Sequence, residues 1–242
     1  GLDDHTFATF EALVSSWHPR SEFTRHPVDE RVFDKCPAWS TNKMTYARLL
    51  LPAFLDGIDR VIYSDTAVLW LAPVEDLWRL ADNGAIVLAG RDGFASTLEK
   101  ENEWYATNGY VCPGKDYFCA GVMVFNLKQF RAEKMTEQVL RFIHANPDLK
   151  FADQTALNHL LRGRVHLLSR QWHTLTMELP AGPLQTPVVL HYANEIPWNR
   201  KMRWGLLSDT VMLWHEFNDY YVFGKNSYSL RKYYSWEERF RR

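Results

Sequence analysis

The sequence has few cysteines and no long hydrophobic run. Its 242 residues include only three cysteines, Cys36, Cys112 and Cys119, whose spacing forms neither a disulfide framework nor, with the histidines, a zinc motif. We expect free thiols in a reducing compartment, buried as small hydrophobic side chains. No apolar stretch reaches the roughly 18 residues of a membrane span, and no signal-peptide pattern opens the sequence. These features favour a cytoplasmic protein.

An excess of charge of one sign is also missing, because the formal net charge is −1. No global field would therefore recruit nucleic acid or an acidic membrane. The sequence contains no G-x-G-x-x-G or G-x-x-x-x-G-K, which argues against dinucleotide-binding and P-loop proteins. Hydrophobic residues make up 46% of the chain and aromatic residues 14%. This content supports a large core, and aromatic rings also serve as apolar platforms for sugars.

The stretch VIYSDTAVLW at residues 61–70 combines β-branched and aromatic residues with one acidic residue, Asp65. The pattern predicts a buried strand that ends in an exposed turn at Asp65. Ligands of open α/β sheets bind at the carboxyl ends of the strands, so Asp65 is a candidate binding residue. The alternative is a turn residue that accepts backbone N–H bonds.

Strand patterns alternate with helix patterns along the chain. Helices are predicted at 6–17, 45–54, 74–80, 134–145 and 153–161, and strands at 61–70, 85–89, 121–127, 165–168 and 188–192, with at best a short one at 21–28. Residues 91–115 are expected to form a long functional loop with some local structure. On the helix at 45–54, Arg48 points away from the apolar side, either free to reach an anion or merely solvated. The alternation predicts a three-layer α/β sandwich around a mainly parallel sheet with an antiparallel element.

Four segments are informative as an ordered set. They are MTYARLLLP at 44–52 with VIYSDTA at 61–67, YFCAGVMVFNL at 117–127, FADQTALN at 151–158 and VVLHYANEIPW at 188–198. In this order they resemble the family 8 glycosyltransferases, which include bacterial lipopolysaccharide glucosyl- and galactosyltransferases and the glycogenins. The resemblance implies the GT-A fold, a mainly parallel mixed sheet in an α/β/α sandwich. It further implies retaining transfer of a hexose or related sugar from a nucleotide-diphosphate donor, UDP above all, to a glycan or lipopolysaccharide-type acceptor.

The resemblance implies a Mn²⁺ or Mg²⁺ site. Asp65 matches the first carboxylate of the family's D-x-D motif, and His191 matches the histidine that completes the metal site. Ala67 occupies the position of the expected third ligand, and its methyl group cannot bind a cation. The residue is either an inactivating replacement in an active enzyme, which we favour, or a feature of a natural protein that is degenerate or handles its donor differently.

The resemblance also implies the donor and catalytic residues. Asp153 and Gln154 match the acidic residue and amide beside the transferred sugar, where Asp153 would bind hydroxyls and Gln154 would face the developing oxocarbenium ion. The other implied donor-binding residues are Arg48, Asp65, Thr66, Ala120, Gly121, Asn194 and Trp198. From the residues alone, Asp153 and Gln154 could cap a helix, His191 could be a structural histidine, and Trp198 could belong to the core.

Several features depart from the family pattern. Cys119 stands where the family usually has Asn, Asn194 where Gly is expected, and Ile196 where a phosphate-binding Lys is expected. The family's opening strand and nucleotide-binding loop are not seen ahead of Gly1. We accordingly expect a GT-A catalytic domain at 1–205 and an aromatic, basic and helical extension at 206–242.

The extension allows two interpretations. Basic and aromatic residues suit peripheral docking at the inner face of a membrane, near a lipid-linked acceptor. A packed helix with solvated charges explains the same composition. The alternative to an enzyme is a non-catalytic nucleotide-sugar or glycan-binding protein on the same fold.

Overall fold

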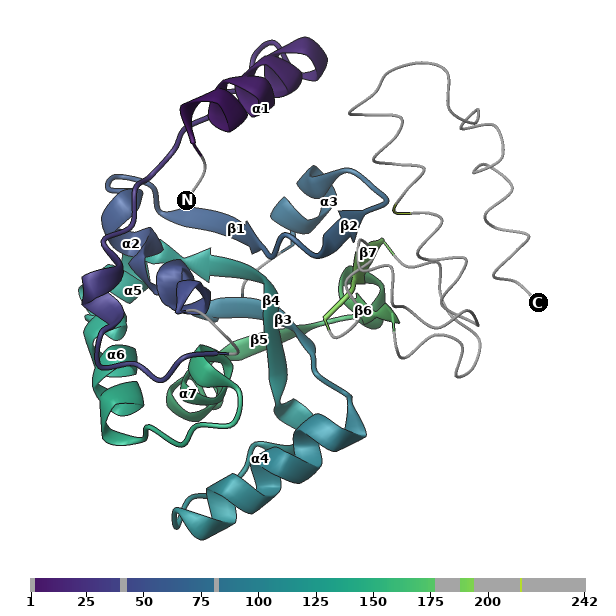
Figure 1. Ribbon diagram of the computed structural model, residues 1–242. Coiled ribbons are helices and arrows are strands. Elements are labelled where there is room, and N and C mark those ends of the chain that lie inside the picture. Colours follow the sequence, from purple (N-terminus) through teal and green to yellow (C-terminus); the bar gives the residue numbers. More distant parts are fainter. Residues whose placement is uncertain (1–2, 40–42, 81–82, 177–187, 194–213, 215–242) are drawn as a thin grey trace, which may run out of the picture.

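A computed structural model describes residues 3–39, 43–80, 83–176, 188–193 and Trp214 (Figure 1). The described α-helices are α1 (Asp4–Trp17), α2 (Leu51–Phe54), α3 (Val74–Trp78), α4 (Ala95–Thr107), α5 (Leu127–Ala132), α6 (Met135–Ala145) and α7 (Ala152–Leu160). Short 3₁₀ helices are η1 (Glu30–Phe33), η2 (Met44–Leu50), η3 (Gly114–Asp116) and η4 (Arg170–Trp172). The strands are β1 (Arg60–Ser64), β2 (Val68–Trp70), β3 (Val87–Arg91), β4 (Phe118–Asn126), β5 (Val165–Leu168), β6 (Thr174–Leu175) and β7 (Val189–His191).

The described strands form two mixed sheets. The larger has the order β1-β4-β3-β5, in which β4 runs antiparallel to both neighbours and β3 runs parallel to β5. The smaller has the order β2-β7-β6, with β2 antiparallel and β6 parallel to β7. The expected mixed sheet is confirmed, although antiparallel pairing has a larger share in the described residues than a mainly parallel sheet implies.

Both faces of the larger sheet are buried, which explains why β3 and β4 read as continuous apolar runs. Met123 and Phe125 of β4 face one apolar cluster, together with side chains of η2, α4, α5, α6 and α7. Val122 and Val124 alternate with them and face a second cluster that includes Leu77 of α3. Because successive side chains of a strand point to opposite faces, the side chains of β4 belong alternately to these two apolar clusters.

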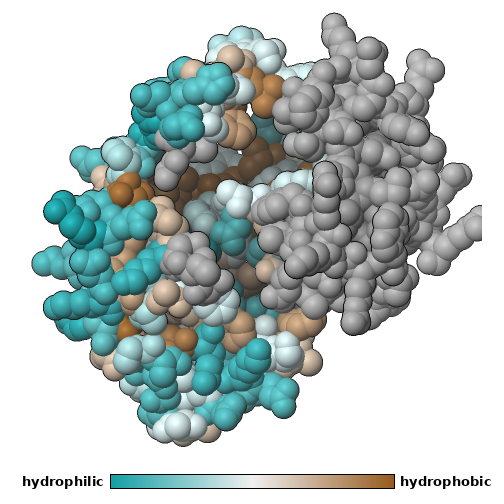
Figure 2. Space-filling view, viewed as in Figure 1, coloured by the Kyte–Doolittle hydropathy of each residue, from teal (hydrophilic) through white to brown (hydrophobic). Residues whose placement is uncertain are grey.

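Three layers follow from this division. Figure 1 shows α2, α5, α6 and α7 on one side of the larger sheet, and α3 with the smaller sheet on the other. The expected three-layer α/β architecture is confirmed. Figure 2 shows hydrophobic side chains at the bottom of a hollow, in the region where Figure 1 places β1 and α3. There β1 forms an edge of the described sheet, and its Val61, Ile62 and Tyr63 stay half-buried.

Most predicted elements are present in the structure. The predicted helix at 45–54 begins as the 3₁₀ helix η2 and continues as α2. The stretch 61–70 is divided into β1 and β2 by a turn at 65–67. The short strand considered at best for residues 21–28 is absent, and the local structure expected within the loop at 91–115 includes the 13-residue helix α4. Of the expected extension at 206–242, only Trp214 is described, and its ring centroid lies 5.4 Å from that of Tyr192.

Candidate active site

Four of the singled-out segments meet at one pocket of about 140 Å³. It lies where the carboxyl end of β1, the start of β4, the start of α7, η2 and the end of β7 come together. The lining residues are Trp39, Thr45, Arg48, Asp65, Asp92, Thr97, Cys119, Ala120, Gly121, Phe151, Asp153, Gln154, His191 and Ala193. Residues far apart in the sequence therefore share one site.

Arg48 lies at the centre of this pocket and is only 8% exposed. Its Nη2 lies 3.2 Å from Asp65 Oδ1 and its Nε 3.1 Å from Asp153 Oδ2. Nη1 donates to the carbonyl of Ala120, and the guanidinium lies over the ring of Tyr63. Burial disfavours the charged form, but Asp153, Tyr63 and Asp65 outweigh it and raise the pKa of Arg48. The expectation that Arg48 is free is therefore wrong, because protein groups hold its guanidinium.

Asp65 follows the last residue of β1 and is fixed by its neighbours. Its backbone N–H donates to the carbonyl of Gly121 in β4 at 2.8 Å. Oδ1 accepts from the Tyr63 hydroxyl, and Oδ2 lies 3.8 Å from His191 Nε2. The side chain is 28% exposed, so a ligand in the pocket can reach it. Asp65 thus combines an anchored backbone with an accessible carboxylate.

Asp153 lies in the first turn of α7, and its side chain is 2% exposed. Thr45 Oγ1 donates to its Oδ1 at 2.8 Å, while Oδ2 faces Arg48. Burial raises the pKa of Asp153 against the opposing effects of Arg48 and Thr45. Ala152, just before it, has φ 49°, a left-handed conformation that is uncommon for a residue with a Cβ. The N-cap of α7 is Phe151 with no side-chain cap bond, so the helix-capping alternative for Asp153 does not hold.

Gln154 is fixed at both ends of its amide. The backbone N–H of Ala120 donates to Oε1 at 2.9 Å, and Nε2 donates to Asp92 Oδ2 at 3.0 Å. These partners set the orientation of the amide, because a backbone donor requires oxygen and a carboxylate requires nitrogen. Among the described residues only Ala120 donates to Oε1, which leaves its second lone pair without a donor from this part of the chain.

His191 is buried at the end of β7 among polar groups. Its Nδ1 lies 3.0 Å from His173 Nε2 and 3.7 Å from Cys119 Sγ. Burial, with the nearby charge of Arg48, lowers the pKa of His191 to about 4, so the imidazole is neutral at pH 7. A Cβ at Gly121 would lie 2.1 Å from His191 Cε1. Glycine is therefore required there for the ring to lie against β4.

Other predicted site residues lie elsewhere or outside the description. Thr66 is exposed in the turn between β1 and β2 and does not line the pocket. Ala67, in the same turn, packs against a cluster that contains Leu190 and Tyr192, and its carbonyl accepts the Tyr192 N–H at 2.9 Å. Two further predicted residues lie outside the described part of the chain: Asn194 and Trp198.

The sequence analysis missed several residues of the site. Asp92 directly follows the buried strand β3, the same signal that singled out Asp65, and burial raises its pKa. Thr45 and Tyr63 lay inside quoted motifs but were assigned no role. His173 belongs to no motif, and only the pairing of β6 with β7 brings it beside His191.

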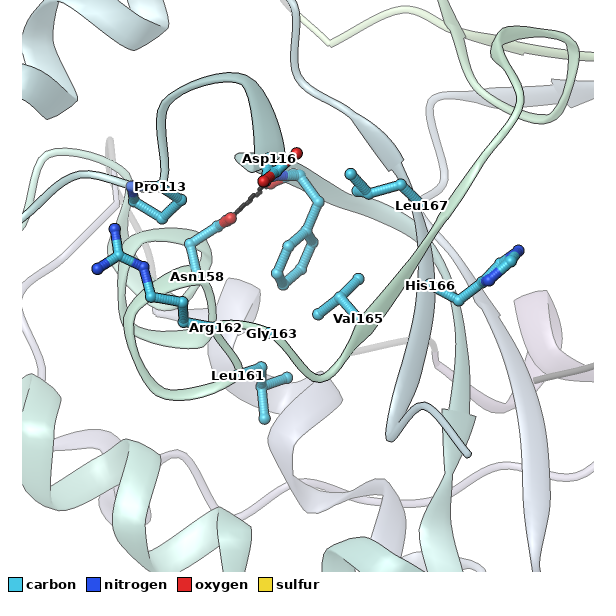
Figure 3. Close-up of a pocket in the computed structure, with 10 residues that line it drawn as sticks. Pro113, Asp116, Asn158, Leu161, Arg162, Gly163, Val165, His166 and Leu167 are labelled. Atoms are coloured by element: carbon cyan, nitrogen blue, oxygen red, sulfur yellow. Dashed lines mark hydrogen bonds between the residues drawn. The ribbon is translucent and has the colours of Figure 1, made fainter. Parts of the chain in front are cut away.

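A larger cavity, of about 310 Å³, lies away from these groups (Figure 3). Asn158 accepts a hydrogen bond from the Phe118 backbone there at 2.8 Å. Figure 3 shows Val165 and Leu167 beside the cavity, whereas the polar ends of Arg162 and His166 point to opposite sides. Because its polar groups do not converge, this cavity is a weaker candidate for chemistry despite its size.

The chain is similar in sequence to known proteins. The model of the family described as Glycosyl transferase family 8 matches residues 2–202. General stress protein A of Bacillus subtilis is 30% identical over 177 residues, which cover 65% of this chain and 59% of the relative. Lipopolysaccharide 1,2-glucosyltransferase of Escherichia coli is 26% identical over 119 residues, 49% of this chain and 34% of the relative. The chain thus spans less than two thirds of these curated relatives.

Solved structures show the same architecture. The galactosyltransferase LgtC, in complex with donor and acceptor sugar analogs, superposes with a TM-score of 0.71 at 24% identity, covering 88% of this chain and 81% of that one. The bifunctional glycosyltransferase WbbM superposes with a TM-score of 0.62 at 21% identity, covering 82% of this chain and 40% of that one. These likenesses establish the GT-A fold predicted for this chain.

Proposed function

This chain belongs to glycosyl transferase family 8, and from that premise we propose that it transfers a hexose or related sugar with retention at the anomeric carbon. The donor would be a nucleotide-diphosphate sugar, a UDP-sugar, and the acceptor a glycan or a lipopolysaccharide-type molecule. The observation that carries the proposal is the position of Arg48 between Asp65 and Asp153. Together with the bond from Arg48 to the Ala120 carbonyl, this arrangement joins three of the four sequence segments at one pocket. LgtC, of the same fold, was solved with donor and acceptor sugar analogs, which supports both substrate classes.

A Mn²⁺ or Mg²⁺ ion fits the pocket side of Asp65. Asp65 Oδ2 and His191 Nε2 lie 3.8 Å apart, close enough for both to bind one ion. A carboxylate and a neutral imidazole suit Mn²⁺, and such ions commonly complete their coordination with substrate phosphates and water. When bound, the ion would offset the charge that develops on the leaving diphosphate.

Gln154 and Asp153 would act beside the transferred sugar. The fixed amide of Gln154 would present the free lone pair of Oε1 to the positive charge that develops at the anomeric carbon. Asp153 would bind sugar hydroxyls at the edge of its carboxylate and also hold Arg48 in place. Because both Asp153 and Gln154 are positioned before the substrate arrives, little reorganisation is needed during the reaction.

The backbone of β4 would form the surface under the sugar. The Ala120 carbonyl accepts from Arg48 and its N–H donates to Gln154, so the peptide groups on both sides of this residue are fixed. Ala120 and Gly121 have small or no side chains, so a sugar ring can approach the strand closely. Thr66, Asn194 and Trp198 remain proposed donor-binding residues.

Ala67 is proposed to impair the metal site. A missing carboxylate ligand would cost several kcal/mol of metal and transition-state stabilisation, hence orders of magnitude in rate. The two explanations, an inactivating replacement and a natural difference, remain hypotheses, and we favour the first.

The interaction with a membrane is a further proposal. Among the described residues, no helix has the length and apolar character needed to cross a bilayer. The aromatic and basic residues of 206–242, Trp214 apart, lie outside the described part of the chain. We propose that they dock the protein at the inner face of a membrane that carries the acceptor. Flotation with liposomes tests this, and binding independent of anionic lipid would contradict it.

The release of UDP from a panel of UDP-sugars, with and without Mn²⁺, tests the main proposal. We expect metal-dependent turnover with at least one donor and product sugars of retained anomeric configuration by NMR. Saturable donor binding without turnover, even after Ala67→Asp, would instead support the non-catalytic binding protein. The absence of both binding and turnover would contradict each of them.

A further inference from the structure

We propose that Cys119, His173 and His191 form a second, buried cation site, for which Zn²⁺ is the best match. Their candidate ligand atoms all lie within 4.8 Å of one another. The three residues are 5%, 2% and 4% exposed. One thiolate and two imidazoles are ligands that Zn²⁺ favours. The site is distinct from the position between Asp65 and His191 Nε2, because it uses the opposite ring nitrogen of His191.

The distances agree with tetrahedral coordination. Zn–N bonds of about 2.0 to 2.1 Å and Zn–S bonds of about 2.3 Å give edges of roughly 3.3 Å between two nitrogens and 3.6 Å between nitrogen and sulfur. His173 Nε2 and His191 Nδ1 are 3.0 Å apart, and Cys119 Sγ and His191 Nδ1 are 3.7 Å apart. These two edges lie within a few tenths of an ångström of the tetrahedral values, and the third, between Cys119 Sγ and the ring nitrogen of His173, is no longer than 4.8 Å.

Two glycines leave room for the imidazole rings in these positions, because neither has a Cβ. A Cβ at Gly121 would lie 2.1 Å from His191 Cε1, and a Cβ at Gly90 would lie 2.1 Å from His173 Cβ. Each histidine therefore lies directly against a strand of the larger sheet. Rings that are already fixed lose little entropy when they bind an ion, which favours a preformed site.

A hydrogen bond between His173 and His191 explains why their rings are in contact. It does not explain why Cys119 Sγ also lies beside His191 Nδ1. The chain contains a useful comparison: Cys36 Sγ lies 3.5 Å from His144 Nε2, a pair to which the described residues add no third ligand. A single thiol and imidazole cannot enclose a cation. The convergence of three ligand atoms distinguishes the Cys119 cluster from this pair.

Ion binding at the cluster has a defined proton balance. The Cys119 thiol releases its proton to solvent and binds as thiolate, while both histidines bind as neutral imidazoles. When His191 Nδ1 binds the ion, its remaining ring proton lies on Nε2 and points toward Asp65. A ligating histidine commonly donates its other N–H to a carboxylate in this way.

A second expectation rests on the proposed function and concerns the Mn²⁺ site, which also uses His191. The neutral His191 ring cannot supply lone pairs to both positions, so Zn²⁺ in the cluster would remove His191 from the Mn²⁺ site. We expect micromolar Zn²⁺ to inhibit Mn²⁺-dependent turnover in the chain, and His173→Gln to be less sensitive.

Titration with Co²⁺ tests the site without reference to activity. We expect one Co²⁺ per chain, with a thiolate-to-cobalt charge-transfer band and intense tetrahedral d–d bands, both abolished by added Zn²⁺. Cys119→Ser should lose the charge-transfer band, and His173→Gln should weaken binding at least tenfold. Cys36→Ser is the matched control, a buried cysteine beside one histidine, and should leave the spectrum unchanged.

Asp65→Asn separates this inference from the proposed function. It leaves all three cluster ligands in place, so it should keep the cobalt spectrum even where transfer is lost. Circular dichroism verifies that each variant is folded. A thiolate–cobalt band that survives Cys119→Ser, or its absence from the folded parent protein, would overturn the proposal whether or not sugar transfer is found.

Discussion

Arg48 Nε lies 3.1 Å from Asp153 Oδ2, with side-chain exposures of only 7% and 2%. This buried pair connects η2 to the start of α7. Removing one partner of a buried ion pair leaves an uncompensated charge, which typically costs about 3 to 5 kcal/mol. That cost is lower here, because Asp65 is a second carboxylate partner for Arg48. The same contact therefore stabilises the fold and shapes the candidate site.

Asp153→Asn should reduce both stability and turnover. The substitution keeps the shape of the side chain but leaves Arg48 with one carboxylate, so we expect a loss on the order of 1 to 3 kcal/mol in the free energy of unfolding. Transfer should fall at least a hundredfold. Urea denaturation and donor turnover measure the two effects. Asp76→Asn removes the exposed pair with Arg79 and should cost about 0 to 1 kcal/mol; equal losses in both variants would contradict the prediction.

Gly121→Ala should displace His191. The added Cβ would lie 2.1 Å from His191 Cε1, so the ring or the strand must move. We expect a loss of about 1 to 3 kcal/mol in stability and weaker Mn²⁺ binding, measured by calorimetry. The double variant Gly121→Ala with His191→Ala removes the clash and should recover part of the stability, but not metal binding. No recovery would show that the backbone, and not the ring, resists the Cβ.

Glu101 should make stability depend on pH. Burial raises its pKa to about 7 from the ordinary value of 4.5, and its Oε2 lies without a hydrogen-bond partner. Between these values Glu101 binds more proton in the folded state than in the unfolded state, so its contribution to stability should fall as pH rises from about 4.5 to 7. Buried His173 and His191 contribute in the opposite direction over this range, because burial lowers their pKa values below the ordinary 6.5. The full effect of Glu101 is up to about 3 kcal/mol.

Glu101→Gln tests this dependence, because a neutral amide mimics the protonated acid and keeps the hydrogen bond from Thr155 Oγ1. We expect the variant to lose this contribution, so that its stability relative to the parent rises between pH 4.5 and 7 in thermal unfolding. Glu99→Gln, exposed on the same helix, should retain it. Parallel curves for Glu101→Gln and the parent protein would contradict the prediction.

The helix α4 and its bounds, inside the loop expected at 91–115, were not predicted from the sequence. The buried positions of α4 include Thr97 and Glu101 as well as Trp104 and Tyr105. A polar residue on the inner face weakens the apolar period that identifies a helix. By contrast α6 buries Met135, Val139 and Ile143 at helical spacing, and its predicted bounds agree with the structure within one residue.

The candidate site shows the same limit. Ordered motifs were enough to single out Asp65, Asp153, Gln154 and His191 from the sequence alone. They did not reveal that Arg48 is held by carboxylates, because this depends on how η2 packs against α7. The meeting of Cys119 with His173 likewise requires residues of the smaller sheet and its flanks to pack against β3 and β4 of the larger one. Contacts that arise from tertiary packing leave no local signal in the sequence.

Ala67→Asp should increase metal-dependent chemistry. A carboxylate two residues after Asp65 would add a ligand, and we expect donor hydrolysis with Mn²⁺ to rise by about 10- to 1000-fold, equivalent to roughly 1.4 to 4 kcal/mol of barrier. Because Ala67 packs against the cluster of Leu190 and Tyr192, the variant without metal should be less stable. Mn²⁺ should then raise its melting temperature more than that of the parent chain.

Ala67→Asn is the matched control for this substitution. It has nearly the same size and polarity but no charge, so it should share the loss of stability without the gain in turnover. If Ala67→Asp gains nothing over Ala67→Asn in Mn²⁺-dependent hydrolysis, the absent carboxylate is not what limits this chain. Saturable UDP-sugar binding in both variants would then favour the binding protein, because the remaining pocket residues would recognise the donor without turning it over.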